Sequence, residues 1–176
     1  PTREALEEAI ASLEKGRYGL AFSSGMAAIT AVLLAFSKGD HIVMCKDVYG
    51  GAFQLATEVF PRFGIEVSFI DETKLEEWEK AIKENTKAFY LETPSNPLLK
   101  ITDIKGVVKI AKKHNIFTII DNTFMTPQYL NPIPLGVDVV VHSATKFLNG
   151  HSDVVLGMIV TDNEEIYKAL KKQQII

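Results

Sequence analysis

Apolar runs and helical patterns alternate along the whole chain. Short runs that are dense in β-branched and other apolar residues predict buried strands, whereas apolar residues spaced three and four apart predict helices. The runs predict strands at 20–22, 41–45, 66–70, 88–91, 117–120, 137–141 and 154–160. The spaced patterns predict helices at 2–15, 26–36, 53–63 and 75–83, a helix between a cap at 103 and a stop at 114–115, and a last helix at 164–172.

This alternation implies crossover connections between strands. It predicts an α/β fold with a mostly parallel sheet sandwiched by helices. The strands are continuously apolar rather than alternating, as expected for strands buried on both faces. No repeat or linker-like stretch interrupts the pattern, so we expect residues 1–176 to form one domain. Ligands of such sheets bind just outside the carboxyl ends of the strands, which is where we look for chemistry.

Composition narrows the class of protein further. The chain has 176 residues, enough for a real hydrophobic core, and a net charge of −3 argues against a nucleic-acid or anionic-membrane surface. No apolar run approaches the roughly 20 residues of a membrane span. The single cysteine, Cys45, cannot form an internal disulfide, so a cytoplasmic location is the default expectation. The histidines lack metal-ligand spacing, and we expect no metal site.

The first predicted strand is followed by Ser23-Ser24-Gly25-Met26, which opens a helix. Free backbone N–H groups and the positive end of the helix dipole make such a turn an anion site. Gly25 would let the backbone approach a phosphate closely. Small residues before a helix are more often only a cap and a tight turn, so this signal is weak alone.

Two further strand ends carry side chains suited to a flat ligand. Tyr49 follows the 41–45 strand beside two glycines, and its ring could lie over a flat ring. Asn96 follows the 88–91 strand between Pro94 and Pro97, which stiffen the loop and aim the amide. A half-buried aromatic in a turn and a plain polar turn are the simpler interpretations.

The last two strand ends carry charged groups. Asp121, followed by Asn122-Thr123, comes directly after a buried strand, where a carboxylate needs a partner or a proton. Lys146 follows Ser143 and Thr145 after the 137–141 strand. Partial desolvation there would free its amine for Schiff-base chemistry. The simpler alternatives are a helix cap at Asp121 and a lysine that extends from a strand end into water.

Together these features provide a phosphate cradle, an aromatic plate, a carboxylate and a lysine at one edge of one sheet. Pyridoxal phosphate requires that set. Its phosphate needs N–H and hydroxyl donors, its ring needs a stacking partner, its pyridine nitrogen needs a carboxylate to stay protonated, and its aldehyde needs an amine.

These runs resemble the trans-sulfuration (Cys/Met metabolism) enzymes of the aspartate-aminotransferase fold, type I, and their large cofactor domain. The matching runs are Ser23-Ser24-Gly25-Met26-Ala27-Ala28, Asp47-Val48-Tyr49-Gly50-Gly51, Glu92-Thr93-Pro94-Ser95-Asn96-Pro97, Asp121-Asn122-Thr123-Phe124, Ser143-Ala144-Thr145-Lys146 and Asn149-Gly150-His151-Ser152-Asp153. The resemblance covers essentially the whole chain.

The resemblance implies a role for each candidate residue. Lys146 would hold pyridoxal 5'-phosphate as a Schiff base and shuttle protons, and Asp121 would pair with the pyridinium. Tyr49 would stack on the ring and serve as acid or base for the leaving group. Asn96 would contact the phenolic oxygen, and Thr123 would lie near the ring. The phosphate would be gripped by the backbone of Gly25 and Met26 and by the hydroxyls of Ser143 and Thr145.

The resemblance also implies a homo-oligomer, a dimer or tetramer, that makes or breaks C–S bonds in sulfur amino acids. It leaves β-lyase, γ-lyase, γ-synthase and sulfhydrylase open. Relatives carry an N-terminal arm that reaches a neighbouring subunit and a C-terminal domain that binds the substrate carboxylate. This chain lacks both segments, so we expect a fragment. Two alternatives stay open: an inactive cofactor-binding or oligomerisation module, and a phosphate-binding doubly wound protein without Schiff-base chemistry.

Overall fold

The computed structural model describes residues 1–175 and divides them into two compact units. Unit 1 combines residues 1–35 with the described residues from Asp121 onward, and unit 2 is Phe36–Ile120. The expectation that residues 1–176 form one cofactor-binding domain stays a prediction. One boundary falls between Ile120 and Asp121, so the apolar run 117–120 belongs to unit 2 and the carboxylate that follows it belongs to unit 1.

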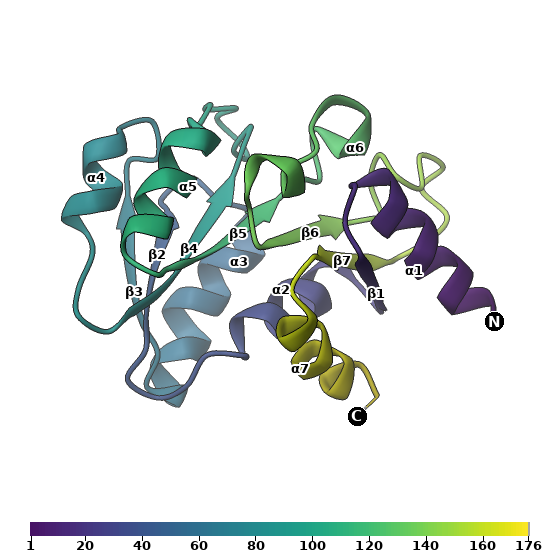
Figure 1. The fold of residues 1–176 in the computed structure, drawn as a ribbon, viewed down its shortest axis with the longest axis horizontal. Helices are drawn as coiled ribbons and strands as arrows, with labels where there is room; N and C mark the ends of the chain where they lie inside the picture. The colour runs from purple at the N-terminus through teal and green to yellow at the C-terminus, as the bar shows by residue number, and fades with distance from the viewer. Residues whose placement is uncertain (176) are drawn as a thin grey trace. The chain divides into compact units, whose positions relative to one another are not determined.

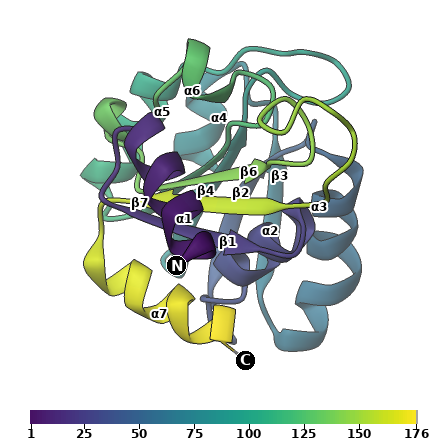
Figure 2. The same cartoon turned by 90° about the vertical axis from the view of Figure 1, so that its right-hand side faces the viewer.

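Unit 1 contains three neighbouring strands that pair antiparallel. Strand β7 (Gly157–Thr161) lies between β1 (Tyr18–Phe22) and β6 (Val139–Ser143) and runs antiparallel to both. Helices α1 (Thr2–Leu13), α2 (Gly25–Leu33) and α7 (Glu164–Ile175) pack against these strands, and α7 lies beside β1 (Figure 2). Two short helices that the sequence pattern missed, α6 (Thr126–Tyr129) and a 3₁₀ turn at Ile133–Leu135, connect β5 to β6.

Unit 2 carries the parallel part of the fold. Strand β2 (His41–Cys45) pairs in parallel with β3 (Glu66–Ile70) on one side and β4 (Thr86–Glu92) on the other, and β5 (Phe117–Asp121) follows β4 in the strand order. Helices α4 (Leu75–Lys80) and α5 (Ile104–Lys113) pack together (Figure 1). Trp78 of α4 is fully buried against Phe89, with ring centroids 5.1 Å apart.

The predicted α/β class is confirmed, with a mixed rather than uniformly parallel arrangement of strands. The β2–β3 and β2–β4 pairs are parallel, whereas β1–β7 and β6–β7 are antiparallel. β2 and β3 begin and end where the sequence predicted them. All five residues of β2 are buried, as the continuous apolar run required.

Two predicted elements differ from the structure for identifiable reasons. The helix predicted at 53–63 changes type twice: α3 (Gly50–Gln54) continues as a π-helix (Leu55–Val59) and a 3₁₀ turn (Phe60–Phe63). Pro61 lacks a backbone N–H and disfavours a continued α-helix. The strand predicted at 154–160 begins only at Gly157, because Val154 and Val155 are exposed and the N–H of Leu156 bonds to the Thr145 hydroxyl instead of a neighbouring strand.

Among residues 1–175, no helix combines the length and apolar character needed to cross a membrane.

Candidate active site

The turn before α2 in unit 1 has the geometry of an anion site. Ser24 caps the helix, and its hydroxyl accepts a hydrogen bond from the N–H of Ala27 at 3.0 Å. Gly25 and Met26 are the first two residues of the nine-residue helix, so their N–H groups lie at its positive end. A Cβ at Gly25 would lie 2.7 Å from the Ser143 Cβ, so only glycine lets α2 approach β6 this closely.

A hydrogen-bonded chain connects Asp121 to Ser143 through Thr123. The Thr123 hydroxyl donates to Asp121 Oδ1 at 2.5 Å, and the Thr123 N–H donates to the same oxygen at 3.0 Å. The Ser143 N–H donates to the Thr123 hydroxyl at 2.8 Å. Unit 1 therefore brings Gly25, Ser143, Thr123 and Asp121 together, as the sequence predicted. The two hydrogen bonds from Thr123 orient the Asp121 carboxylate.

The Asp121 side chain is almost fully buried at the end of β5. Burial raises the pKa of its carboxyl above the ordinary value, while the two hydrogen bonds from Thr123 and the charge of His142 act in the opposite direction. Such a carboxylate gains from a cationic partner, because a positive charge within a few ångströms favours the ionised form.

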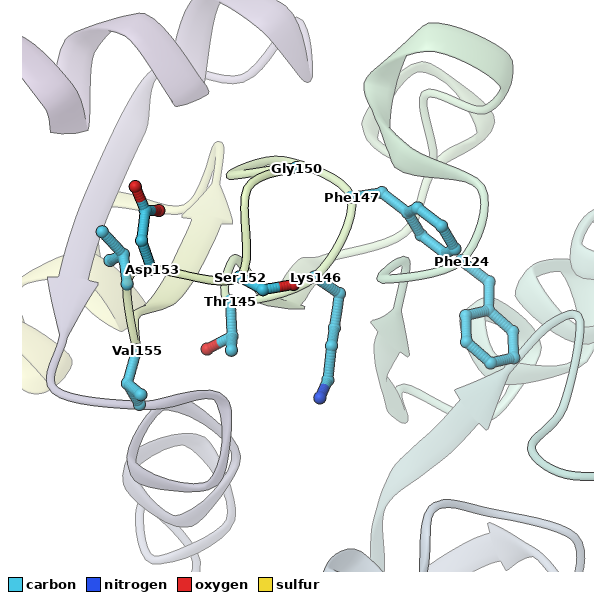
Figure 3. A pocket seen from close by; sticks show the side chains of 9 residues that line it. Phe124, Thr145, Lys146, Phe147, Gly150, Ser152, Asp153 and Val155 are labelled. Carbon is cyan, nitrogen blue, oxygen red and sulfur yellow. The ribbon is translucent and has the colours of Figure 1, made fainter.

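Lys146 lies in the turn after β6 and lines a cavity of about 610 Å³. Figure 3 shows its side chain extending between Thr145 on one side and Phe124 on the other. The sequence predicted partial desolvation of this amine, but the side chain is exposed in this chain. Lys146 is exposed because it lies in the turn beyond β6 and not in the strand itself. Phe147 and Gly150, in the same turn, are exposed as well.

Thr145 lines the same cavity, yet its hydroxyl already has partners. It accepts from the N–H of Leu156 at 3.0 Å and lies 3.3 Å from the Leu156 carbonyl oxygen, to which it donates. These bonds hold the end of the 144–156 loop against β6. Thr145 thus fixes the loop that carries Lys146, and a phosphate would compete with Leu156 for the hydroxyl proton.

Tyr49 and Asn96 lie in unit 2, at the ends of the adjacent parallel strands β2 and β4. The Tyr49 N–H donates to Glu92 Oε2 at 2.8 Å, and the Ser95 hydroxyl donates to Asp47 Oδ2 at 2.5 Å. These two bonds tie the turn after β2 to the loop after β4. Tyr49 itself is 45% exposed, so its ring is available to a ligand, and Asn96 is half-buried.

Sequence reasoning missed a buried polar cluster formed by Glu14, Asn122 and His142. From the sequence, His142 was only excluded as a metal ligand. A histidine after three consecutive valines in a buried strand was the available signal, because a buried polar side chain requires a hydrogen-bond partner. Nothing in the sequence indicated Glu14, which is 128 residues away from His142.

The residues present fit pyridoxal phosphate. The donors at the start of α2 suit a phosphate, and the glycine contact with Ser143 provides the close backbone approach that a phosphate cradle needs. The buried Asp121 suits a protonated ring nitrogen. Lys146 presents a primary amine at a cavity whose volume is within the usual range for small-ligand sites.

The whole chain, residues 1–176, matches the family model described as Cys/Met metabolism PLP-dependent enzyme. It is 58% identical over 174 residues to "Cystathionine beta-lyase MetC" of Bacillus subtilis (strain 168), covering 99% of this chain and 45% of that protein. It is 56% identical to "Cystathionine gamma-lyase" of the same organism, covering 97% and 45%.

Among solved structures, cystathionine gamma-lyase from Lactobacillus plantarum complexed with L-serine superposes with a TM-score of 0.97 at 49% identity, covering 99% of this chain and 46% of that one. The chain therefore spans a little under half the length of the relatives it matches. On the match over its full length, the chain belongs to the Cys/Met metabolism family of PLP-dependent enzymes.

Proposed function

We propose that this chain supplies the cofactor-binding part of an enzyme that makes or cleaves C–S bonds in sulfur amino acids, with Lys146 as the residue that binds the cofactor. The observation that carries the proposal is the chain of hydrogen bonds that runs from Asp121 through Thr123 to Ser143. Ser143 lies three residues before Lys146. It couples the proposed phosphate grip to the proposed pyridinium partner. The names of the relatives support a cystathionine β- or γ-lyase type of reaction.

When bound, pyridoxal phosphate supplies an aldehyde and an electron-withdrawing ring. The residues of this chain would bind the cofactor, orient it and transfer protons. Lys146 Nζ would hold the cofactor at its aldehyde carbon, and once freed by the substrate amine it would carry a proton from and back to the substrate. Asp121 would keep a proton on the ring nitrogen, and Thr123 orients Asp121 through the two bonds to Oδ1.

The other candidate residues bind and orient. The N–H groups of Gly25 and Met26 and the hydroxyls of Ser143 and Thr145 would hold the phosphate, with Thr145 exchanging its bond to Leu156. Asn96 would contact the phenolic oxygen. Tyr49 would stack on the ring and act as acid or base for the leaving group.

For the whole protein we propose a cytoplasmic homo-oligomer, a dimer or tetramer, in which residues 1–176 form the large cofactor domain. The exposed side chain of Lys146 supports this assembly, because an amine used in this chemistry is normally shielded from water by surrounding protein. The same observation favours a second possibility for the isolated chain, namely a module that binds the cofactor and turns over little substrate.

The proposal is tested by adding pyridoxal phosphate to the full-length protein, reducing with borohydride and mapping the modified peptide. We expect the adduct on Lys146 and its loss in Lys146→Ala. Lys112→Ala, which removes an exposed lysine from α5, is the matched control and should keep the adduct. An adduct on another lysine, or none in the full-length protein, contradicts the proposal.

The type of C–S chemistry is tested separately. Product analysis with cystathionine distinguishes β- from γ-cleavage, and activated homoserine esters test for synthase or sulfhydrylase activity. We expect cleavage of cystathionine. A protein that carries the Lys146 adduct yet acts on none of these substrates contradicts the proposed reaction while leaving the cofactor assignment intact.

A further inference from the structure

Behind the proposed site, unit 1 contains a buried carboxylate that the chemistry above does not use. Glu14 follows the last residue of α1, and its side chain is fully buried. Its Oε1 accepts two hydrogen bonds: one from Asn122 Nδ2 at 2.8 Å and one from His142 Nε2 at 2.6 Å. A short, charge-assisted bond of this kind fixes the geometry of both donors.

The two donors are the chain neighbours of two proposed site residues. Asn122 directly follows Asp121, and His142 directly precedes Ser143 on β6. Successive side chains of a strand point to opposite faces, so Ser143 faces Gly25 of α2 while His142 points to the other face, toward Glu14. One oxygen atom of Glu14 therefore anchors both strand ends from the face opposite the proposed cofactor.

Further bonds make this anchor stiff. The Asn122 N–H donates to the Val141 carbonyl oxygen at 3.0 Å, and its side chain also donates to the Leu130 carbonyl oxygen at 3.0 Å. On the site face, Thr123 connects Asp121 to Ser143. The ends of β5 and β6 are thus cross-linked on both faces, and Asp121 lies between the two sets of bonds.

The electrostatic effect of His142 on Asp121 also supports a role for this cluster. The charge of His142 favours the ionised form of Asp121 and opposes the effect of burial. A protonated imidazole at this position would be paired with the Glu14 carboxylate at 2.6 Å. Without Glu14, His142 and Asn122 would each keep a buried donor without its partner.

We propose that Glu14 is a positioning residue that acts through Asn122 and His142 to hold Asp121 aligned and ionised for the ring nitrogen of the cofactor. The inference rests on the proposed function, because it requires Asp121 to be the pyridinium partner. A positioning role and a general packing role predict different results. If Glu14 positions Asp121, its loss should weaken the contact with the ring nitrogen and leave the contacts with phosphate and aldehyde.

The test measures equilibrium binding to the full-length protein of pyridoxal phosphate and of its analogue with carbon in place of the ring nitrogen. Wild type should prefer pyridoxal phosphate, and Asp121→Asn should remove that preference. Glu14→Ala should reduce the preference about fivefold or more, the lower end of coupling between two sites. Glu8→Ala, at an exposed position on the same helix, is the matched control and should leave it unchanged.

Equal weakening of both ligands in Glu14→Ala, or no weakening of either, overturns the inference. If that variant does not fold, Glu14→Gln keeps the size and removes the charge, and an unchanged preference in Glu14→Gln overturns the inference as well. Absence of any preference in wild type contradicts the role proposed for Asp121 and the inference with it. A wild-type preference that persists without Glu14 refutes only the inference.

Discussion

Gly25 shows how one missing side chain shapes the candidate site. The contact between α2 and β6 leaves no room for a Cβ there, because Ser143 Cβ, Cα and Oγ all lie within 2.9 Å of the position it would occupy. The sequence predicted a glycine needed for close approach of a ligand. The structure adds that the same glycine is needed for the approach of two elements of the protein.

We predict that Gly25→Ala destabilises the protein by about 1–3 kcal/mol, the usual cost of inserting a methyl group where packing is already tight. The displaced helix start should also weaken cofactor binding. Thermal or urea unfolding measures the first effect and equilibrium titration the second. Gly50→Ala is the matched control, because a Cβ there would meet no atom within 4 Å and should be nearly neutral. Equal effects at both positions would contradict the packing argument.

Asp121 predicts a dependence of stability on pH in the cofactor-free protein. Folding raises the pKa of this carboxyl, so the folded state holds its proton more tightly than the unfolded state. The favourable contribution is complete below the ordinary pKa of 3.8 and is lost as the pH rises through the folded value.

Asp121→Asn removes this titration and keeps an oxygen that can accept both bonds from Thr123. We therefore expect the melting temperature of wild type, relative to Asp121→Asn, to fall as the pH rises from about 4 to about 8. Differential scanning calorimetry of both proteins over that range measures it. A constant or rising difference would show that burial does not dominate the environment of this carboxyl.

At the scale of elements, α5 is the clearest case of a helix specified locally. Asp103 caps it by accepting from the N–H of Gly106 at 3.0 Å, Ile104, Val107, Val108 and Ala111 form its buried face, and His114 and Asn115 end it, all as the sequence predicted. The region 50–63 shows the limit of local specification. Its apolar pattern is helical, but Pro61 changes the hydrogen-bond pattern in a way that apolar spacing does not encode.

We predict that Asp103→Ala destabilises the protein by about 1 kcal/mol, the typical cost of losing a side-chain cap. Lys105→Ala changes an exposed residue two positions later and should be close to neutral. Chemical denaturation of both variants measures the difference. A loss in Lys105→Ala as large as in Asp103→Ala would indicate that the cap bond contributes little.

At the scale of the whole molecule, the residues near strand ends were predictable and their supporting partners were not. Asp121 and Lys146 follow apolar strands, and the rule for parallel sheets directs attention to those positions. Glu14 carries no such signal, because its bonds to Asn122 and His142 join segments 108 and 128 residues apart.

The burial of Trp78 gives this protein an internal optical reporter. It is the single tryptophan of the chain, it lies in unit 2, and its indole N–H donates to the Glu72 carbonyl oxygen at 3.3 Å. Its emission should be blue-shifted in the native state and move to longer wavelength when unit 2 opens. Absorbance of a cofactor attached to Lys146 would report on unit 1. Tryptophan fluorescence and cofactor absorbance can therefore follow the unfolding of the two units separately in one sample.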